Sequence, residues 1–66
     1  MDIDSIFTYH APKGDQTQRY KALRDSAKLF ALLVNDSCPD SREKSLAITK
    51  IQEAIMWANA SIAVNE

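Results

Sequence analysis

The chain has 66 residues, of which 45% are hydrophobic and 26% are charged, and its formal net charge at pH 7 is -1. This length suits one small domain, and the composition is too apolar for a disordered tail and too interrupted by charges for a membrane span. Without a positive excess, the chain has no general attraction to a nucleic-acid polymer or an anionic membrane, so any anion must be held locally.

The chain contains one cysteine, Cys38, which excludes an internal disulfide framework and a cysteine-rich zinc site. Because Asp36 and Asp40 lie close to Cys38 in the sequence and disfavour a thiolate, we interpret its side chain as structural. The acidic start Met-Asp-Ile-Asp differs from the basic beginning of a secretory signal peptide. We therefore expect a cytoplasmic protein.

The first half of the chain predicts an arm followed by a helix. Residues 1–14 form an N-terminal arm without a sustained hydrophobic period, in which residues 2–7 allow a short helical turn. Asp15, with Gln18 three residues later, is typical of a helix start, and apolar residues at steps of three and four predict a helix over 15–35. The apolar stripe consists of Tyr20, Leu23, Ala27, Phe30 and Val34.

A turn and a second helix follow. Residues 36–40 predict a turn, since Pro39 cannot continue the preceding helix. Asp40 together with Glu43, or alternatively Ser41, begins a helix over 41–64. The sequence therefore predicts an all-α fold, in which one domain over residues 1–66 is an antiparallel two-helix hairpin with a short N-terminal arm. The predicted seam of the second helix consists of Ile48, Ile51, Ile55, Ala58 and Ile62.

The chain has more apolar residues than one hairpin can bury. A hairpin has a single shared face, and the ordering of its backbone costs roughly 1 to 2 kcal/mol per residue. Two short helices do not offset this cost alone, so we expect a compact homo-oligomer in which other copies supply the missing core. The expected interface residues are Phe7, Leu29, Leu32, Leu33, Met56 and Trp57.

The sequence contains none of the residue sets that common enzymes require. It has one histidine, no glycine-rich phosphate loop and no base paired with a serine. The carboxylates fall at predicted caps or on solvated faces, and His10 with Asp15 would be too few ligands for a metal. We therefore expect no catalysis, no metal and no cofactor.

Aromatic and cationic residues gather in the arm and in the first helix. Aromatic rings stack on nucleobases, and Lys or Arg side chains donate to phosphate oxygens. Pattern alone nevertheless favours packing against a neighbouring subunit and ordinary ion pairs on a solvated face. The candidate ligand-binding residues are Tyr9, His10, Lys13, Lys21, Arg24 and Lys28.

Several segments of the chain resemble a known family. The arm reads FTYHAPK, the first helix contains RYKALR, the turn and the start of the second helix read CPDSREKSLA, and the second helix contains MWANASIA. Together they resemble the small phage family that includes the anti-CBASS cyclic-oligonucleotide sponges. CBASS is a bacterial immune system that signals with cyclic oligonucleotides.

This resemblance implies a helical homohexamer that sequesters cyclic dinucleotides, with cyclic trinucleotides as a further ligand class, in the cytoplasm of the infected bacterial host without degrading them. It also implies that Tyr9 stacks on a base and that Arg24 contacts the phosphodiesters, with Lys21 and Lys28 one turn away on either side. His10 either contacts the ligand or orients the arm, and the second role is favoured. Val64 stands where the family's helix end typically has an Arg, so no residue is assigned to a trinucleotide pocket.

Two other functions fit the same fold. One is a helical module that inhibits a host protein through its exposed apolar side chains, and the other is a small phage structural or DNA-associated oligomer. For the sponge, the approximate two-fold symmetry of a cyclic dinucleotide favours a site between two copies of the arm. Ligand capture would then depend on oligomer formation.

Overall fold

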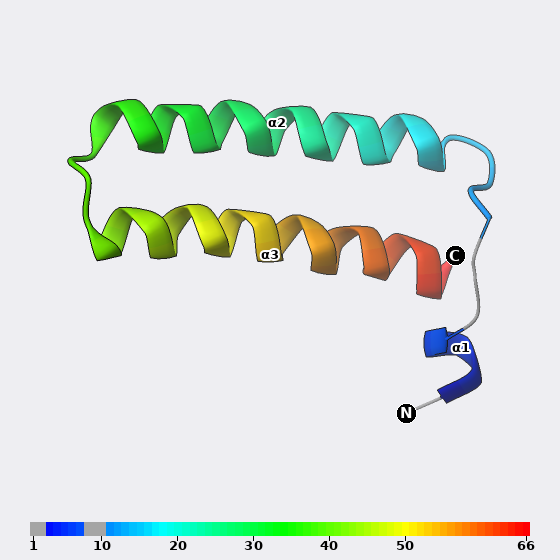
Figure 1. The fold of residues 1–66 in the computed structure, drawn as a ribbon. Coiled ribbons are helices and arrows are strands. Elements are labelled where there is room, and N and C mark those ends of the chain that lie inside the picture. Colours follow the sequence, from blue (N-terminus) through cyan, green and yellow to red (C-terminus); the bar gives the residue numbers. More distant parts are fainter. Residues whose placement is uncertain (1–2, 8–10) are drawn as a thin grey trace.

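The computed structural model describes residues 3–7 and 11–66, and these residues form helices without any strand (Figure 1). Helix α1 spans Ile3–Phe7, α2 spans Gln16–Ser37 and α3 spans Arg42–Asn65. The two long helices lie side by side and antiparallel, and α1 lies at the open end of the pair. No described helix has an apolar stretch long enough to cross a membrane. The predicted all-α hairpin is confirmed.

The start of α2 differs from the predicted cap. Asp15 occupies the N-cap position, but its side chain makes no capping hydrogen bond, and its Oδ1 accepts from Arg19 Nε at 3.1 Å instead. Gln16 takes over the local hydrogen bonding, because its Oε1 accepts from Lys13 N at 2.9 Å while its own N donates to Lys13 O at 2.9 Å. The predicted capping pair of Asp15 and Gln18 is therefore wrong.

At the start of α3, Ser41 is the residue that caps the helix. Its Oγ accepts from Lys44 N at 3.1 Å, which satisfies one of the free amides of the first turn. Asp40, the other candidate, instead pairs with Lys44 Nζ at 2.9 Å. Cys38 ends α2 in an extended conformation, as expected for a residue that precedes Pro39, and its thiol is free and exposed.

Ionic and polar contacts join the two chain segments at the open end of the hairpin. The Arg19 guanidinium binds both carboxylate oxygens of Glu66, with Nη1 and Oε2 at 2.9 Å. The hydrogen bond from Arg19 lowers the pKa of the Glu66 carboxyl, and the charge of Arg19 and a hydrogen bond from Gln16 lower it further. These contacts connect the beginning of α2 to the end of α3.

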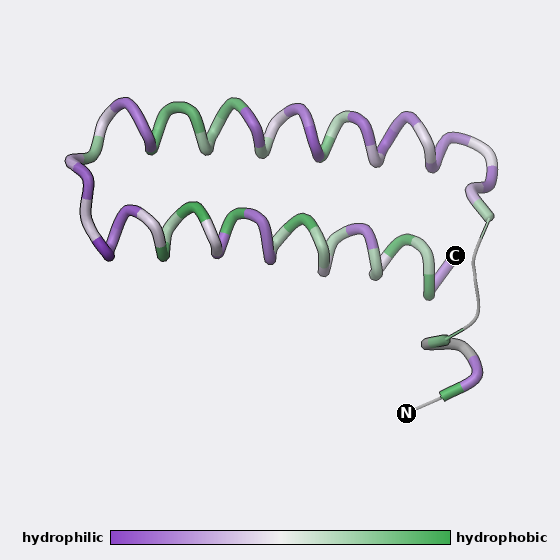
Figure 2. The backbone as a smooth tube through the Cα atoms, viewed as in Figure 1, coloured by the Kyte–Doolittle hydropathy of each residue, from purple (hydrophilic) through white to green (hydrophobic). Residues whose placement is uncertain are grey.

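The hairpin is one layer of helices without a closed core. The principal extents are 42, 26 and 13 Å, and no hydrophobic side chain among the described residues is buried. Figure 2 shows hydrophobic residues on both helices, densest in the second half of α2. The predicted stripe of α2 is only partly covered, since Tyr20 and Leu23 are half-buried while Phe30 is 56% exposed. The expected interface residues Phe7, Leu29, Leu32, Leu33, Met56 and Trp57 are all exposed.

We predict that Arg19→Gln and Glu66→Gln each lower the melting temperature at pH 7 by less than about 5 °C, because the ion pair is solvent-exposed. The double variant should melt close to Arg19→Gln alone, since that substitution already removes the pair with Glu66 together with the contact to Asp15. Thermal denaturation followed by circular dichroism measures these values. Fully additive losses would show that the two side chains do not act as a pair.

The stability that the Arg19–Glu66 ion pair contributes depends on pH. The folded-state pKa of Glu66 is lowered, so its contribution to stability is complete above the ordinary value of 4.5 and is lost as the pH falls through the lowered value. The difference in melting temperature between wild type and Glu66→Gln should therefore shrink steadily as the pH is lowered below 4.5 and Glu66 becomes protonated. A difference that does not change with pH over this range would contradict the electrostatic origin.

Candidate ligand-binding groove

The candidate residues of the arm are only partly described by the structure. Tyr9 and His10 lie outside the described residues. Lys13 is exposed, and its Nζ donates to the main-chain oxygen of Glu66 at 3.3 Å. Lys13 therefore lies at the open end of the hairpin, beside the point where the arm joins α2.

The three candidate cations of α2 do not form one group. Arg24 and Lys28, one turn apart, line the same hollow of about 370 Å³ between α2 and α3. Lys21 does not line this hollow, and its Nζ donates to Asp25 Oδ2 at 2.6 Å. The structure thus brings Arg24 and Lys28 together and leaves Lys21 in a local ion pair.

Arg24 and Lys28 have no carboxylate within ion-pair distance in the part of the chain that the structure describes. Their charges do help to lower the pKa of Asp25, but the largest cause of that shift is the hydrogen bond from Lys21. Their donors therefore remain available to another anion. Arg42, the first residue of α3, and Lys13 likewise have no ion-pair partner among the described residues, although Lys13 donates to the main-chain oxygen of Glu66. The side chains that do have a carboxylate partner are those of Arg19, Lys21, Lys44 and Lys50.

A second hollow, of about 260 Å³, is lined by Tyr20, Asn59, Ala60 and Ala63. Asn59 lines both hollows, so the two lie next to each other on the hairpin. Steps of four residues place the side chains of Tyr20, Arg24 and Lys28 along one side of α2. We call the two hollows together the cationic groove, with Tyr20, Arg24 and Lys28 on α2 and Gln52, Met56 and Asn59 on α3.

Part of this groove was not predicted from the sequence. Tyr20 was assigned to the packing stripe, and no role was predicted for Gln52 or Asn59, which are seven residues apart and so share one face of α3. This seven-residue spacing is the sequence signal that could have identified Gln52 and Asn59 as neighbours. Whether that face meets the cations of α2 depends on how the two helices are rotated about their axes, which the spacing within one helix does not determine.

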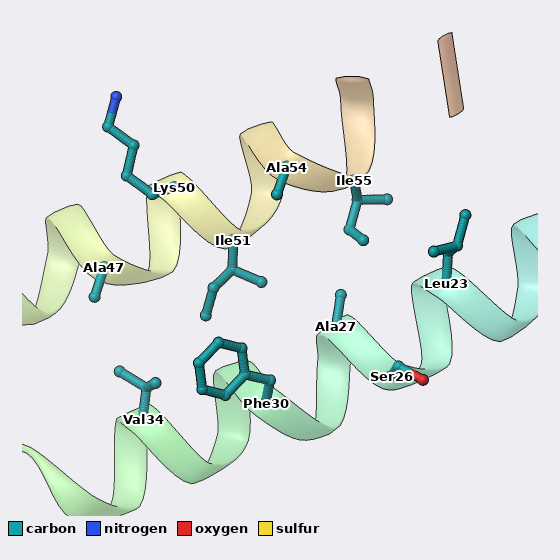
Figure 3. A pocket seen from close by; sticks show the side chains of 10 residues that line it. All are labelled: Leu23, Ser26, Ala27, Phe30, Val34, Ala47, Lys50, Ile51, Ala54 and Ile55. Atoms are coloured by element: carbon teal, nitrogen blue, oxygen red, sulfur yellow. The ribbon is translucent and has the colours of Figure 1, made fainter. Parts of the chain in front are cut away.

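The other side of the hairpin has a larger and more apolar hollow, of about 630 Å³. In Figure 3, Phe30 and Val34 of α2 lie opposite Ile51 and Ala47 of α3, and the amino group of Lys50 points away from them. None of the described candidate ligand residues lines this hollow. Its surface is suited to an apolar partner surface and not to a phosphate.

The described residues include no cluster of three or more His, Cys, Asp or Glu side chains that could hold a metal ion. The cationic groove instead offers positive charge, amide groups, a phenol ring and an apolar floor that includes Met56 and Ala31. These groups bind by hydrogen bonds, charge and van der Waals contact. An organic anion with a flat ring is the class of ligand that uses all of them.

The family model described as Acb2/Tad1, hairpin domain, matches residues 1–63, which include the arm and nearly all of the two long helices. The chain belongs to the Acb2/Tad1 hairpin family. This is the anti-CBASS sponge family, so the resemblance seen in the sequence is confirmed. No curated protein and no solved structure matches the chain at a significant level.

Membership of the Acb2/Tad1 family implies sequestration of the cyclic nucleotides of CBASS immunity by a phage protein. Sequestration is a binding activity and requires no reacting group. The cationic groove of this family member can therefore be tested by its affinity for a cyclic dinucleotide.

We predict that Arg24→Gln and Lys28→Gln each weaken the binding of a cyclic dinucleotide about tenfold, because each removes a charge-assisted hydrogen bond to a phosphate. Lys21→Gln is the matched control on the same helix and should change the affinity less than about threefold, since Lys21 pairs with Asp25. Isothermal titration calorimetry measures all three. Equal losses for the three variants would indicate a general charge effect and contradict a site at the groove.

Proposed function

We propose that this member of the Acb2/Tad1 family captures cyclic dinucleotides in the cytoplasm of the infected bacterial host and holds them without breaking a bond. Cyclic trinucleotides are a second ligand class in this proposal. The observation that carries it is the pair of Arg24 and Lys28, which line one groove and have no ion-pair partner among the described residues. Family membership supplies the class of ligand.

The charge and symmetry of the ligand support this proposal. A cyclic dinucleotide carries two phosphodiester charges on an approximately two-fold ring, and a two-fold interface between identical subunits presents each side chain twice. Arg24 and Lys28 of two subunits would face both phosphodiesters. Tyr9 would stack on a base, with a gain of about 1 to 3 kcal/mol. His10 would orient the arm or donate to the ligand.

The proposal includes a homo-oligomer, which we take to be a hexamer from the family resemblance. Its support is the single layer of helices with no buried hydrophobic side chain among the described residues. Stable domains bury apolar faces between two layers, so further copies are the nearest source of the second layer. The proposed interface residues are Phe7, Leu29, Leu32, Leu33, Met56 and Trp57, which are 48 to 83% exposed in one subunit.

A release experiment tests sequestration directly. The protein is mixed with a cyclic dinucleotide, the free ligand is measured by filtration, and the sample is then heated to denature the protein. We expect depletion of free ligand before heating and full recovery of unmodified ligand afterwards. Loss of ligand after heating would indicate an enzyme. No depletion before heating would contradict the proposal and favour the protein-inhibiting module or the phage structural oligomer.

Tyr9→Ala is the variant that tests the proposed stacking within the same experiment. Loss of one stacked ring should weaken cyclic-dinucleotide binding by roughly 1 to 3 kcal/mol without dissociating the oligomer. Unchanged affinity of Tyr9→Ala would remove the arm from the binding site.

The oligomer has its own test. We predict that Leu33→Lys weakens self-association at least about tenfold, since it places a charge on a side chain that another copy would cover. Asn35→Lys, two residues later at an exposed polar position, is the matched control and should leave assembly unchanged. Sedimentation velocity across a concentration series compares them with the wild type. A wild-type protein that remains a folded monomer at micromolar concentration would contradict the oligomer.

A further inference from the structure

Three donors converge on Glu66 at the open end of the hairpin, where α2 begins and α3 ends (Figure 1). The Arg19 guanidinium binds both side-chain oxygens of Glu66, and a hydrogen bond from Gln16 reaches the same carboxyl. The Lys13 ammonium donates to the main-chain oxygen of Glu66 at 3.3 Å. Gln16 is only 4% exposed and is joined to Lys13 by two hydrogen bonds. A buried polar side chain therefore helps to order these donors around one carboxylate.

Asp15 sets the direction of the Arg19 side chain. Its Oδ1 accepts from Nε of Arg19 at 3.1 Å, while Nη1 and Nη2 are the donors that face Glu66. Two donors at the end of a guanidinium bind a carboxylate or a phosphate in the same bidentate way. If Glu66 moved away, Arg19 would therefore keep two donors aimed at the position of an anion.

Glu66 can leave this position at little cost. The side chains of Arg19 and Glu66 are 38% and 46% exposed, and ion pairs of this kind contribute little to stability. Helix α3 ends at Asn65, so Glu66 lies just beyond the helix, and its movement breaks no turn of α3. Its carboxylate would return to water while another anion takes its place at Arg19.

The space beside Arg19 can receive more than a phosphate group. Arg19 borders a hollow of about 420 Å³, whose other lining residues are Ala22, Leu23, Ser26 and Ile62. Apolar walls and one hydroxyl thus lie next to the guanidinium. This hollow shares no residue with the cationic groove. The Arg19 side chain therefore belongs to a separate place on the hairpin.

We propose that Arg19 and Lys13 form a second anion site, that Glu66 occupies it in the ligand-free protein, and that a phosphodiester of the captured ligand displaces Glu66. The inference rests on the proposed function, because a cyclic oligonucleotide is the source of the phosphodiester. Glu66 is then an internal competitor. The ligand binds the fraction of molecules in which Arg19 is free, so the apparent affinity is reduced by that fraction.

Glu66→Gln tests the competition, since it keeps the size of the side chain and removes its charge. Calorimetric titrations with cyclic di-AMP and with cyclic tri-AMP should show that at least one of them binds about threefold more tightly than to the wild type. The ligand that gains affinity is the one that supplies the phosphodiester. A purely structural contact would behave differently, because its loss would lower the melting temperature without any gain in affinity.

Two further variants identify the cation and control for charge. Arg19→Gln should weaken binding of the same ligand about tenfold, and adding Glu66→Gln to it should bring no gain. Asp40→Asn is the matched control, because it also removes a carboxylate from a cation, Lys44, but at the turn between α2 and α3. It should change either affinity less than about 1.5-fold.

The outcomes separate this inference from the function on which it rests. Unchanged or weaker binding of both ligands by Glu66→Gln would overturn the competition and leave capture in place. A gain that persists in the Arg19→Gln background, or an equal gain in Asp40→Asn, would show a general charge effect and overturn the site at Arg19. Binding of neither ligand by the wild type would overturn the proposed function itself.

Discussion

Two helices that pack against each other can cover only one face of each helix. This limit explains why so much apolar surface of this small protein is exposed. The hairpin is one layer of helices, and large apolar side chains such as Phe30, Leu33 and Trp57 remain mostly exposed. Burial of apolar surface is the main favourable contribution to folding, so an isolated subunit lacks much of what stabilises larger domains. In our proposal, association supplies this burial and creates the ligand sites at the same time.

Much of the fold could be predicted from the sequence, because helix periodicity and the Cys38–Pro39 turn are local properties. The caps were harder to predict, since several side chains compete for the same amides. Asp15 was expected to cap α2, but a neighbouring guanidinium, that of Arg19, engages its carboxylate, and Gln16 provides the local hydrogen bonds. At α3 the shorter Ser41 side chain reaches the amide, while Asp40 binds Lys44. Which acceptor wins depends on nearby charges, and the sequence pattern does not rank these.

The candidate site could be predicted only in part. The sequence indicated cations on α2, yet it treated Lys21, Arg24 and Lys28 as alternatives. The structure separates them, because Asp25 engages Lys21 while the other two border the groove. The opposing amides of α3 were not foreseen, since the rotation of one helix against another is set by packing along the whole contact. The roles of Tyr9 and His10 remain predictions, because both residues lie outside the described part of the chain.

Among the described residues, the only buried side chain belongs to Gln16, a polar residue at the base of the arm. It holds Lys13 through two hydrogen bonds, and Gly14 between them has a φ of 53°, a backbone conformation that suits glycine. The most buried side chain of the described residues therefore lies at the connection between the arm and α2, whereas larger proteins bury an apolar core. The two hydrogen bonds between Gln16 and Lys13 fix the direction in which the chain enters α2. Replacement of Gln16 by an apolar residue of similar size would keep the helix but remove the hydrogen bond to Lys13 N, so this direction would no longer be fixed.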